Sequence, residues 1–419
     1  MLETTEKGQI KQTLENIMYV FRHDNYLRGA IQKNEMTDRI DITKKLNWKR
    51  SGETLTDNDE YQIYWYFEKT YLISNERKIR QGIRMIAEEN RYHPIRDCLE
   101  SLKWDGEKRV DKLLPKFFGV DDNFYSKEVI RVLMKAMIHR IYNPGCKFEI
   151  MVCLVGGQGV GKSTFFRFLT MNDDWFSDDL KRLDDDKVYR KLQGHWLIEM
   201  SEMLATANAR SIEDIKSFLS RQKDNYKIPY ETHPEDRPRQ CVFVGTSNNM
   251  DFLPLDRTGN RRFAPVPVHP EKVDKHILEN AKESREFIRQ AWAEAYMEYK
   301  SDSEHKLDFS RETKEYLKKL QVEFMPEDTK VGIIQSFLDE TDEDYVCSRM
   351  IYKEAFNHEY DEPKQWELNE INDIMNDCID GFEKVSSHRF KEHGIQRAWK
   401  RTKPRDFESV DDNENPFVK

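Results

Sequence analysis

The sequence lacks the features of a membrane, secreted or fibrous protein. It has no run of about 18 apolar residues, and its opening residues have no apolar core or cleavage site for a secretory signal. With 17 glycines and 14 prolines among 419 residues, it is not a low-complexity chain. We therefore expect a soluble, cytoplasmic protein that does not interact with membranes.

Paired cysteine motifs and a basic charge balance are also missing. The six cysteines are scattered without a C-x-x-C pair, which argues for reduced thiols and against a structural zinc site. Lys and Arg total 68 against 77 Asp and Glu, a net charge of −9. This balance excludes a wholly basic nucleic-acid coat but leaves room for a local basic surface. At about 150 residues per domain, the length suggests two or three domains.

Short apolar runs separated by helical segments predict an α/β core with a parallel sheet. A helix is predicted over Tyr125–Tyr142, ended by the Asn143-Pro144-Gly145 turn. A second, amphipathic helix is predicted from Lys272 to Tyr299. The predicted buried strands are Phe148–Val155, Trp196–Ile198 and Cys241–Val244.

A glycine-rich segment carries the strongest functional signal. It reads GGQGVGKS and fits the phosphate-loop pattern G-x-x-x-x-G-K-[ST], between an apolar strand and a helix. Its backbone N–H groups would bind phosphate oxygens, Lys162 would reach the β- and γ-phosphates, and Ser163 would ligate Mg²⁺. The cofactors expected are ATP and Mg²⁺. The predicted cofactor-binding residues are Gly156, Gly157, Gln158, Gly159, Val160, Gly161, Lys162, Ser163 and Thr164.

Two carboxylates follow in the segment HWLIEMSEM. An apolar strand would deliver Glu199 close to the metal ion, with Glu202 slightly further along the chain. One acid would hold the metal and the other would polarise the attacking water. We assign the metal to Glu199 and the base to Glu202, and the reverse order stays open.

Polar residues after a third strand complete the predicted catalytic set. Asn248 could bind the γ-phosphate or orient the attacking water, and Asn249 is a weaker candidate. Arg261 and Arg262 follow a Gly-Asn turn and could stabilise charge on a transferring phosphoryl group. If they act on the site of a neighbouring subunit, they are arginine fingers, and which of the two acts stays open.

In this order and spacing, the motifs resemble the virulence-associated protein E family of phages, prophages and phage-related islands. This family is related to superfamily 3 helicases and AAA+ ATPases. The resemblance implies ATP-dependent DNA unwinding during replication of a mobile element in a bacterial host cell. It also implies a homo-oligomeric ring, a hexamer, with nucleotide sites between subunits. The matching stretches are HPIRDCLESLKWDGEKRVDKLL, NPGCKFEIMVCLVGGQGVGKST, HWLIEMSEM, IKSFLSRQKDNYKIPYE, RQCVFVGTSN, TGNRRFAPV and the closing GIQRAWKR.

With this resemblance, the expected fold is a P-loop AAA+-type α/β core between two smaller parts. A helical N-terminal region would precede the core, and a small α+β, winged-helix-like domain would follow it. The expected parts are an N-terminal domain of unknown role (1–90), a helical collar-like region (91–145), the ATPase domain (146–300), a connector (301–330), the C-terminal DNA-binding domain (331–405) and an acidic tail (406–419).

Two regions compete for the DNA contact. The first reads as a hairpin before the Asn248 strand, with His233 near its tip. Helicases of the resembled superfamily project such a hairpin into the ring channel. Lys227 stands where the resembled family often has Arg, which keeps the charge but loses the bidentate fork. The predicted contacts on the hairpin flanks are Lys227, Arg237 and Arg239.

The second region is the basic segment from His388 to Arg405, with seven Lys and Arg against one acid, Glu392. A basic strand or wing of this kind would suit the phosphates of duplex DNA. The predicted contacts there are Arg389, Lys391, Arg397, Lys400 and Arg401.

Three functions are compatible with these motifs. The first is a DNA-stimulated ATPase that translocates along DNA and unwinds it. Its expected partners are single-stranded DNA, forked or origin duplex DNA, and a replication initiator or primase. The second is an ATP-switched initiator that marks an origin and recruits a host helicase without unwinding DNA itself. The third is a P-loop kinase, against which the Asn248 strand end and the arginine pair argue.

Overall fold

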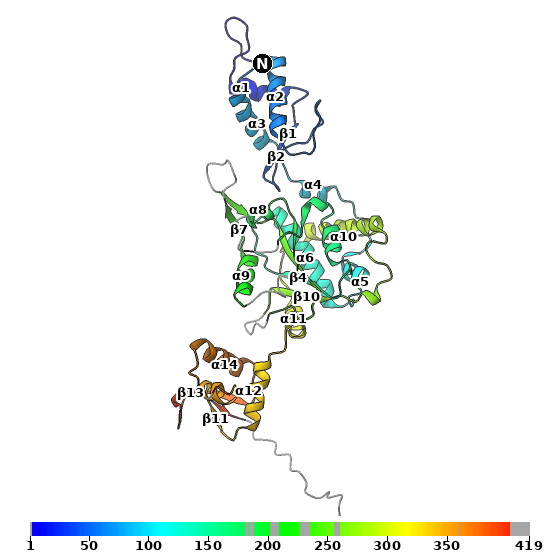
Figure 1. Cartoon of the computed structure of the whole chain (residues 1–419). Helices are drawn as coiled ribbons and strands as arrows, with labels where there is room; N and C mark the ends of the chain where they lie inside the picture. The colour runs from blue at the N-terminus through cyan, green and yellow to red at the C-terminus, as the bar shows by residue number, and fades with distance from the viewer. Residues whose placement is uncertain are drawn as a thin grey trace, which may run out of the picture. The chain divides into compact units, whose positions relative to one another are not determined.

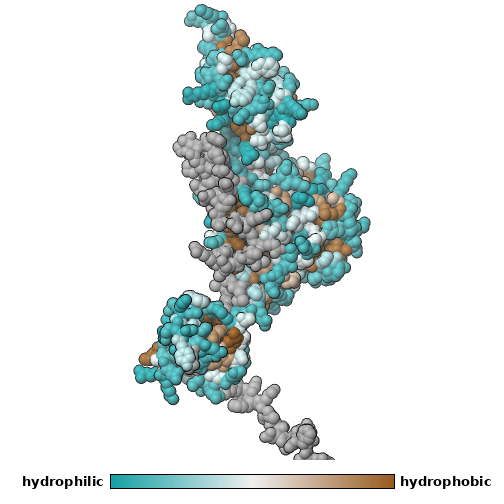
Figure 2. Space-filling view, in the orientation of Figure 1, coloured by the Kyte–Doolittle hydropathy of each residue, from teal (hydrophilic) through white to brown (hydrophobic). Residues whose placement is uncertain are grey.

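The computed structural model describes residues 2–180, 183, 188–201, 209–226, 235–254, 260–358 and 360–402, and Figure 1 shows their elements in chain order. Contacts divide the chain into two compact units: unit 1 comprises Met1–Pro254 with Asn260–Met325, and unit 2 comprises Pro326–Lys419 with Leu255–Gly259. Within the described residues, no helix combines the length and apolarity that a bilayer crossing requires. The face seen in Figure 2 is mainly hydrophilic, in keeping with 35% charged residues.

Unit 1 begins with a small helical part that has its own apolar core, formed by residues 17–87. Its three-stranded sheet has the order β2-β1-β3, with β1 and β2 antiparallel. Thr56 and Asp59 form a capping box that fixes the start of helix α2. The elements of this part are α1 (Leu14–His23), β1 (Ile31–Asn34), β2 (Arg39–Ile42), α2 (Asp57–Tyr71), α3 (Glu76–Glu89) and β3 (Arg91–Tyr92).

A helical segment then leads into the main sheet. Its longest helix is α6 (Phe124–Tyr142), whose start is capped by Asn123. The predicted helix over Tyr125–Tyr142 is therefore confirmed, including its end before the Asn-Pro-Gly turn. The other elements of the segment are α4 (Pro94–Ser101), η1 (Val110–Lys112) and α5 (Leu113–Phe118).

The centre of unit 1 is a parallel five-stranded sheet with the order β10-β4-β9-β6-β5. Strands β4 and β9 are buried along their whole length, as the central strands of a sheet covered on both faces should be. The predicted α/β class with a parallel sheet is confirmed. The strands are β4 (Met151–Val155), β5 (Phe176–Ser177), β6 (Leu197–Ser201), β9 (Val242–Ser247) and β10 (Phe263–Pro267).

Helices pack around this sheet, and Trp196 before β6 stacks on Trp292 of α10 with 4.6 Å between ring centroids. The predicted helix from Lys272 to Tyr299 is wrong at its start, because α10 begins only at Ala281. Pro270 opens a short 3₁₀ turn, η3, and the chain then runs past the glycine loop. The remaining elements are α7 (Lys162–Leu169), η2 (Asp173–Trp175), α8 (Val188–Leu192), α9 (Ala209–Ser220), β7 (Lys223–Tyr226), β8 (Glu235–Pro238), η3 (Pro270–Lys272), α10 (Ala281–Ser301) and α11 (Arg311–Glu323).

Unit 2 has a separate core that contains Ile334, Ile351, Ile374 and Trp399. A three-stranded sheet of order β11-β13-β12 packs with three helices, and β12 and β13 form an antiparallel hairpin with a register shift between Val385 and His388. Its elements are α12 (Thr329–Glu340), β11 (Tyr345–Val346), α13 (Ser348–Glu354), α14 (Gln365–Asp377), β12 (Phe382–Phe390) and β13 (Gly394–Arg401). The six-part division drawn from the sequence is finer than the two units and stays a prediction.

Candidate functional site

The loop between β4 and α7 contains glycines whose backbone conformation a residue with a side chain would adopt only under strain. Gly159 has φ +81° and Gly161 has φ +89°, both in the left-handed region. A Cβ atom on Gly161 would lie 2.7 Å from Cγ2 of Ile277, so this position has no room for a side chain. The loop leads into α7, whose first N–H groups have no partner within the helix. A helix N-terminus that follows such a loop can bind an anion such as a phosphate group.

The Lys162 ammonium links this glycine loop to the end of strand β9. Its Nζ donates to the carbonyl oxygens of Gly156 at 2.6 Å and Gly157 at 2.7 Å. It also donates to Oδ1 of Asn248 at 2.9 Å. The strand order explains the last contact, because β9 lies directly beside β4. Two predicted site residues, Lys162 and Asn248, are thus in direct contact at the loop, where a bound anion would meet the ammonium.

Glu199 lies on β6, on the other side of β9, and is completely buried. Its Oε1 accepts hydrogen bonds from the hydroxyls of Ser163 at 2.8 Å and Ser201 at 2.8 Å. The Thr246 hydroxyl donates to the same oxygen. Three hydroxyls from three elements therefore hold one carboxylate oxygen next to the start of α7.

The second oxygen of Glu199 gives a test of whether this site fits a magnesium ion. Within the described part of the chain, Oε2 is buried and has no hydrogen-bond partner. A buried carboxylate oxygen without a partner is costly unless another group compensates it. Mg²⁺ prefers oxygen ligands and commonly takes one or two carboxylates. The free oxygen of Glu199, beside the hydroxyl of Ser163, fits such an ion.

Three contacts at this site were not anticipated from the sequence. Thr246 and Ser201 share Glu199 Oε1, and their positions at or near strand ends were the only available signal. His276 contacts the carbonyl oxygen of Gly159 through Nε2 at 3.2 Å, while its Nδ1 accepts from the Leu278 N–H. The accepting Nδ1 identifies Nε2 as the protonated nitrogen of the neutral ring. His276 thus donates to the tip of the glycine loop from the segment after β10.

The predicted arginine pair lies at the other end of the sheet. Phe263, which follows Arg262, pairs with Met151 at the start of β4, whereas the glycine loop follows the end of β4. At about 3.3 Å per residue, five residues separate the two ends by about 16 Å. Arg262 contacts Glu149 at 3.3 Å, and Arg261, with 75% of its side chain exposed, lies 3.7 Å from the same carboxylate. The arginines and the glycine loop of one chain are therefore not brought together.

Glu149 is held ionised by this group of residues. Burial alone would raise its pKa, but the Ser220 hydroxyl and the charges of Arg262 and Arg261 outweigh burial and lower the pKa. Ser220 donates to Glu149 at 2.7 Å, and Arg262 Nε donates to Ser220 at 3.1 Å. Arg262 is therefore partly engaged, while Arg261 is the more accessible cation.

Three predicted site residues lie outside the described residues: Glu202, Lys227 and His233. The flanks of the predicted hairpin are described, and β7 and β8 pair antiparallel from Lys223 opposite Pro238 to Tyr226 opposite Glu235. The hairpin prediction agrees with this pairing.

The two arginines predicted on the hairpin flank are both engaged within unit 1. Arg239 is buried, and its Nε and Nη2 donate to the two oxygens of Asp224 at 2.7 and 2.9 Å. Arg237 forms an ion pair with Asp38, from the turn between β1 and β2. The guanidinium of Arg239 is buried and does not contact DNA, contrary to the prediction. It stabilises the base of the β7–β8 hairpin by binding Asp224.

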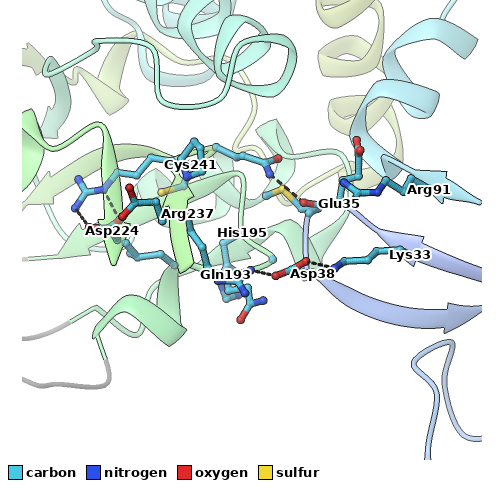
Figure 3. A pocket seen from close by; sticks show the side chains of 16 residues that line it. Lys33, Glu35, Asp38, Arg91, Gln193, His195, Asp224, Arg237 and Cys241 are labelled. Atoms are coloured by element: carbon cyan, nitrogen blue, oxygen red, sulfur yellow. Dashed lines mark hydrogen bonds and ion pairs between the residues drawn. The ribbon is translucent and has the colours of Figure 1, made fainter. Parts of the chain in front are cut away.

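These arginines line a polar cavity of about 320 Å³ between the β1–β2 turn and the main sheet (Figure 3). The turn is fixed to the core by backbone contacts as well, since Gly194 N–H donates to Met36 O at 3.2 Å. Gln240 Nε2 donates to Glu35 O at 2.9 Å, and Gln240 Oε1 accepts a hydrogen bond from His93 Nε2 at 2.7 Å. Because both cations and carboxylates line it, the cavity favours no ligand of one charge.

The predicted C-terminal DNA contacts are on the β12–β13 hairpin of unit 2. Arg389, Lys391 and Arg397 are exposed, and Lys400 lies 5.9 Å from the centroid of the Tyr345 ring. Arg401 differs, because its Nη2 donates to Leu338 O at 2.6 Å and Thr341 O at 3.2 Å. Arg401 thus closes the C-terminal end of α12 and does not point to solvent.

No cluster of three or more His, Cys, Asp or Glu side chains able to hold a metal occurs within the described ranges. The six cysteines are all free thiols. The oxygen pair of Glu199 and Ser163 fits a cation.

Comparison with solved structures shows that the chain shares its fold with the structure titled "The A form apo structure of NrS-1 C terminal region-CTR(305-718)". The likeness has a TM-score of 0.53 at 13% identity and covers 93% of this chain and all of that one. A second structure of the NrS-1 C terminal region matches with a TM-score of 0.48 at 12% identity, covering 88% of this chain and 96% of that one. No curated protein matches the sequence.

The virulence-associated protein E-like domain matches residues 99–326. This range contains the glycine loop, Glu199, Asn248 and the arginine pair, so it covers the whole of the candidate site in unit 1. It is more than half of the 419 residues. The resemblance drawn from the motifs is thereby confirmed, and the chain belongs to the virulence-associated protein E-like family.

Proposed function

We propose that the protein is a DNA-stimulated ATPase that separates DNA strands during replication of a phage or phage-related element. The observation that carries this proposal is the contact network at the glycine loop. It joins Lys162 to Asn248 and Ser163 to Glu199, from strands that are far apart in sequence. Such a set binds a nucleoside triphosphate and directs water to it, which is the chemistry of a P-loop hydrolase.

The strand order supports an AAA+-type core. The strand with the metal-binding acid does not lie beside the glycine-loop strand, because β9 with Asn248 separates them. A polar residue at the end of the intervening strand stands between the phosphate loop and the acid. Asn248 is therefore in the position to sense or orient a group that binds between Lys162 and Glu199.

Each residue of the network has a proposed part in hydrolysis. Lys162 would exchange its contacts with Gly156 and Gly157 for the β- and γ-phosphate oxygens. Ser163 and Glu199 would hold Mg²⁺, which when bound neutralises phosphate charge. Asn248 would orient the attacking water, and the proposal keeps Glu202 as the base that takes the proton of that water.

The position of the arginine pair supports sites shared between subunits. Arg261 and Arg262 are about 16 Å along the strands from their own glycine loop and so cannot serve it. The exposed Arg261 is the better candidate for a finger that reaches the nucleotide of a neighbour, and Arg262 would position it through Glu149. A ring, proposed here as a hexamer, would complete each site in this way.

The experiment is ATP hydrolysis with and without forked DNA, run on the full chain and on Lys162→Ala. Lys318→Ala, an exposed lysine of α11, is the matched control. We expect Lys318→Ala to hydrolyse ATP at the wild-type rate and Lys162→Ala to lose at least 100-fold. Equal rates in Lys162→Ala and wild type would overturn the assignment of the site.

Arg261→Ala tests the shared site. The variant should lose hydrolysis in the assembled protein and regain it when mixed with Lys162→Ala, because mixed rings contain interfaces with an intact arginine and an intact loop. No recovery on mixing would contradict action between subunits. Hydrolysis without strand separation by wild type would instead favour the ATP-switched initiator.

A further inference from the structure

Unit 2 contains the β12–β13 hairpin and helix α14 (Figure 1). The hairpin and the helix carry charges of opposite sign. Between residues 382 and 401 there are six Lys and Arg against two Glu, a net charge of +4. Helix α14 carries four acids and no Lys or Arg. Its acids are Glu367, Glu370, Asp373 and Asp377. A polyanion that approaches unit 2 is therefore attracted to the hairpin and repelled by α14.

The cations of the hairpin are available to a ligand. Arg389, Lys391 and Arg397 are exposed, and within the described part of the chain none of their three side chains forms an ion pair or hydrogen bond. Most other arginines of the described chain are in ion pairs. Arg349 on α13 of the same unit, for example, pairs with Glu362. The hairpin thus has three charges with no compensation from the fold.

An exposed isoleucine lies among these cations. Ile395 is 63% exposed and is directly opposite Arg389 in the β12–β13 register. Side chains alternate along a strand, so Arg397 lies on the same face as Ile395. One face of the hairpin therefore presents an apolar side chain between two arginines.

We propose that this face of the hairpin enters the minor groove of duplex DNA, with Ile395 as a wedge between base pairs. The inference rests on the DNA-binding function proposed above and specifies the DNA form and the contact. Arginine is suited to a narrow minor groove, whose negative potential is strong. Minor-groove proteins commonly insert an apolar side chain at a base step and kink the duplex.

Helix α14 is not suited to bind in the major groove as an alternative DNA contact. In the major groove its four carboxylates would lie near the DNA phosphates and be repelled by them. A cationic surface gains binding free energy by releasing counterions from DNA, and an acidic helix has no such gain. Of these acids, only Glu370 has a nearby cation among the contacts described, with Lys330 Nζ at 2.6 Å. The acidic helix thus disfavours docking through α14 and leaves the hairpin as the contact.

The test uses the full chain without nucleotide and a 20-base-pair duplex that contains 2-aminopurine, whose fluorescence rises when its base unstacks. Wild type should bind the duplex and raise this fluorescence. Ile395→Ala should bind within about tenfold of wild type but lose the fluorescence rise. The matched control is Ile333→Ala on α12, where the isoleucine is 42% exposed, and it should behave as wild type.

Two further measurements identify the groove. Arg389→Ala and Arg397→Ala should each weaken binding and reduce the salt slope by about one, and Arg349→Ala should change neither. Netropsin, which occupies the minor groove, should compete with the protein. Competition by the major-groove ligand methyl green instead, or a normal fluorescence rise in Ile395→Ala, would overturn the proposal.

The outcome is separable from that of the proposed function. Because duplex binding is measured without ATP, failure of hydrolysis in wild type would remove the ATPase while leaving the minor-groove contact standing. Normal DNA-stimulated hydrolysis together with unchanged duplex binding in all three hairpin variants would remove the minor-groove contact alone.

Discussion

Replacing Arg239 tests whether this arginine of the hairpin flank supports the fold or contacts DNA. The side chains of Arg239 and Asp224 are 1% and 5% exposed. The guanidinium makes two hydrogen bonds to the carboxylate, and its central carbon lies 4.3 Å from the centroid of the Phe218 ring. Arg239→Ala would leave the Asp224 carboxylate buried without its cation at the base of the β7–β8 hairpin.

The expected cost follows from that uncompensated charge. Removing one partner of a buried ion pair costs about 3–5 kcal/mol, whereas replacing both partners by apolar residues is often neutral. Against a total stability of about 5–15 kcal/mol, the single change is large. We therefore expect Arg239→Ala to be strongly destabilised and Arg239→Met combined with Asp224→Leu to recover most of the loss.

Urea unfolding of the three proteins, with DNA affinity measured in parallel, provides the assay. A structural Arg239 predicts a lower urea midpoint for Arg239→Ala and near wild-type stability and DNA affinity for the double variant. The reasoning would be refuted by an unchanged midpoint in Arg239→Ala together with a tenfold weaker DNA affinity in both variants.

Three more predictions follow from single contacts. Gly161→Ala should abolish nucleotide binding because its Cβ has no room, whereas Gly159→Ala, with open space around its Cβ, should cost only about 1–2 kcal/mol of backbone strain; titration with a fluorescent nucleotide checks both. The hydrogen bond from Lys135 lowers the pKa of Asp302 from 3.8 to about 2. The ionised Asp302 therefore stabilises the folded protein fully above about pH 4, and this contribution is lost as the pH falls towards 2. The urea midpoints of Asp302→Asn and wild type should differ at pH 7 and converge between about pH 4 and pH 2. Asn248→Ala should slow hydrolysis about 100-fold with little change in nucleotide binding, and an equal loss of binding would contradict its role in orienting water.

Local patterns predicted much of unit 1. The end of α6 at Tyr142 follows from a turn that no helix continues through, and the apolar runs became the central strands of the sheet. The glycine loop was predictable because its backbone demands particular residues at fixed spacing. Such signals lie within a few neighbouring residues, so a single sequence contains them.

Contacts between distant segments could not be predicted in this way. Arg239 was predicted to contact DNA from the flank of a hairpin, and only the fold brings Asp224 and two aromatic rings around it. The hydroxyls on Glu199 come from three elements whose adjacency depends on the strand order. A contact between distant segments also explains why α10 begins later than predicted. The chain before α10 packs against Gly161 of the glycine loop through Ile277.

The central claim is that the glycine loop powers DNA strand separation, and a forked-duplex assay with ATP tests it most directly. Wild type should separate the strands and hydrolyse ATP faster with DNA than without it. Lys162→Ala should do neither, while Lys318→Ala should match wild type. Strand separation by Lys162→Ala, or none by a wild type that hydrolyses ATP, would contradict the claim.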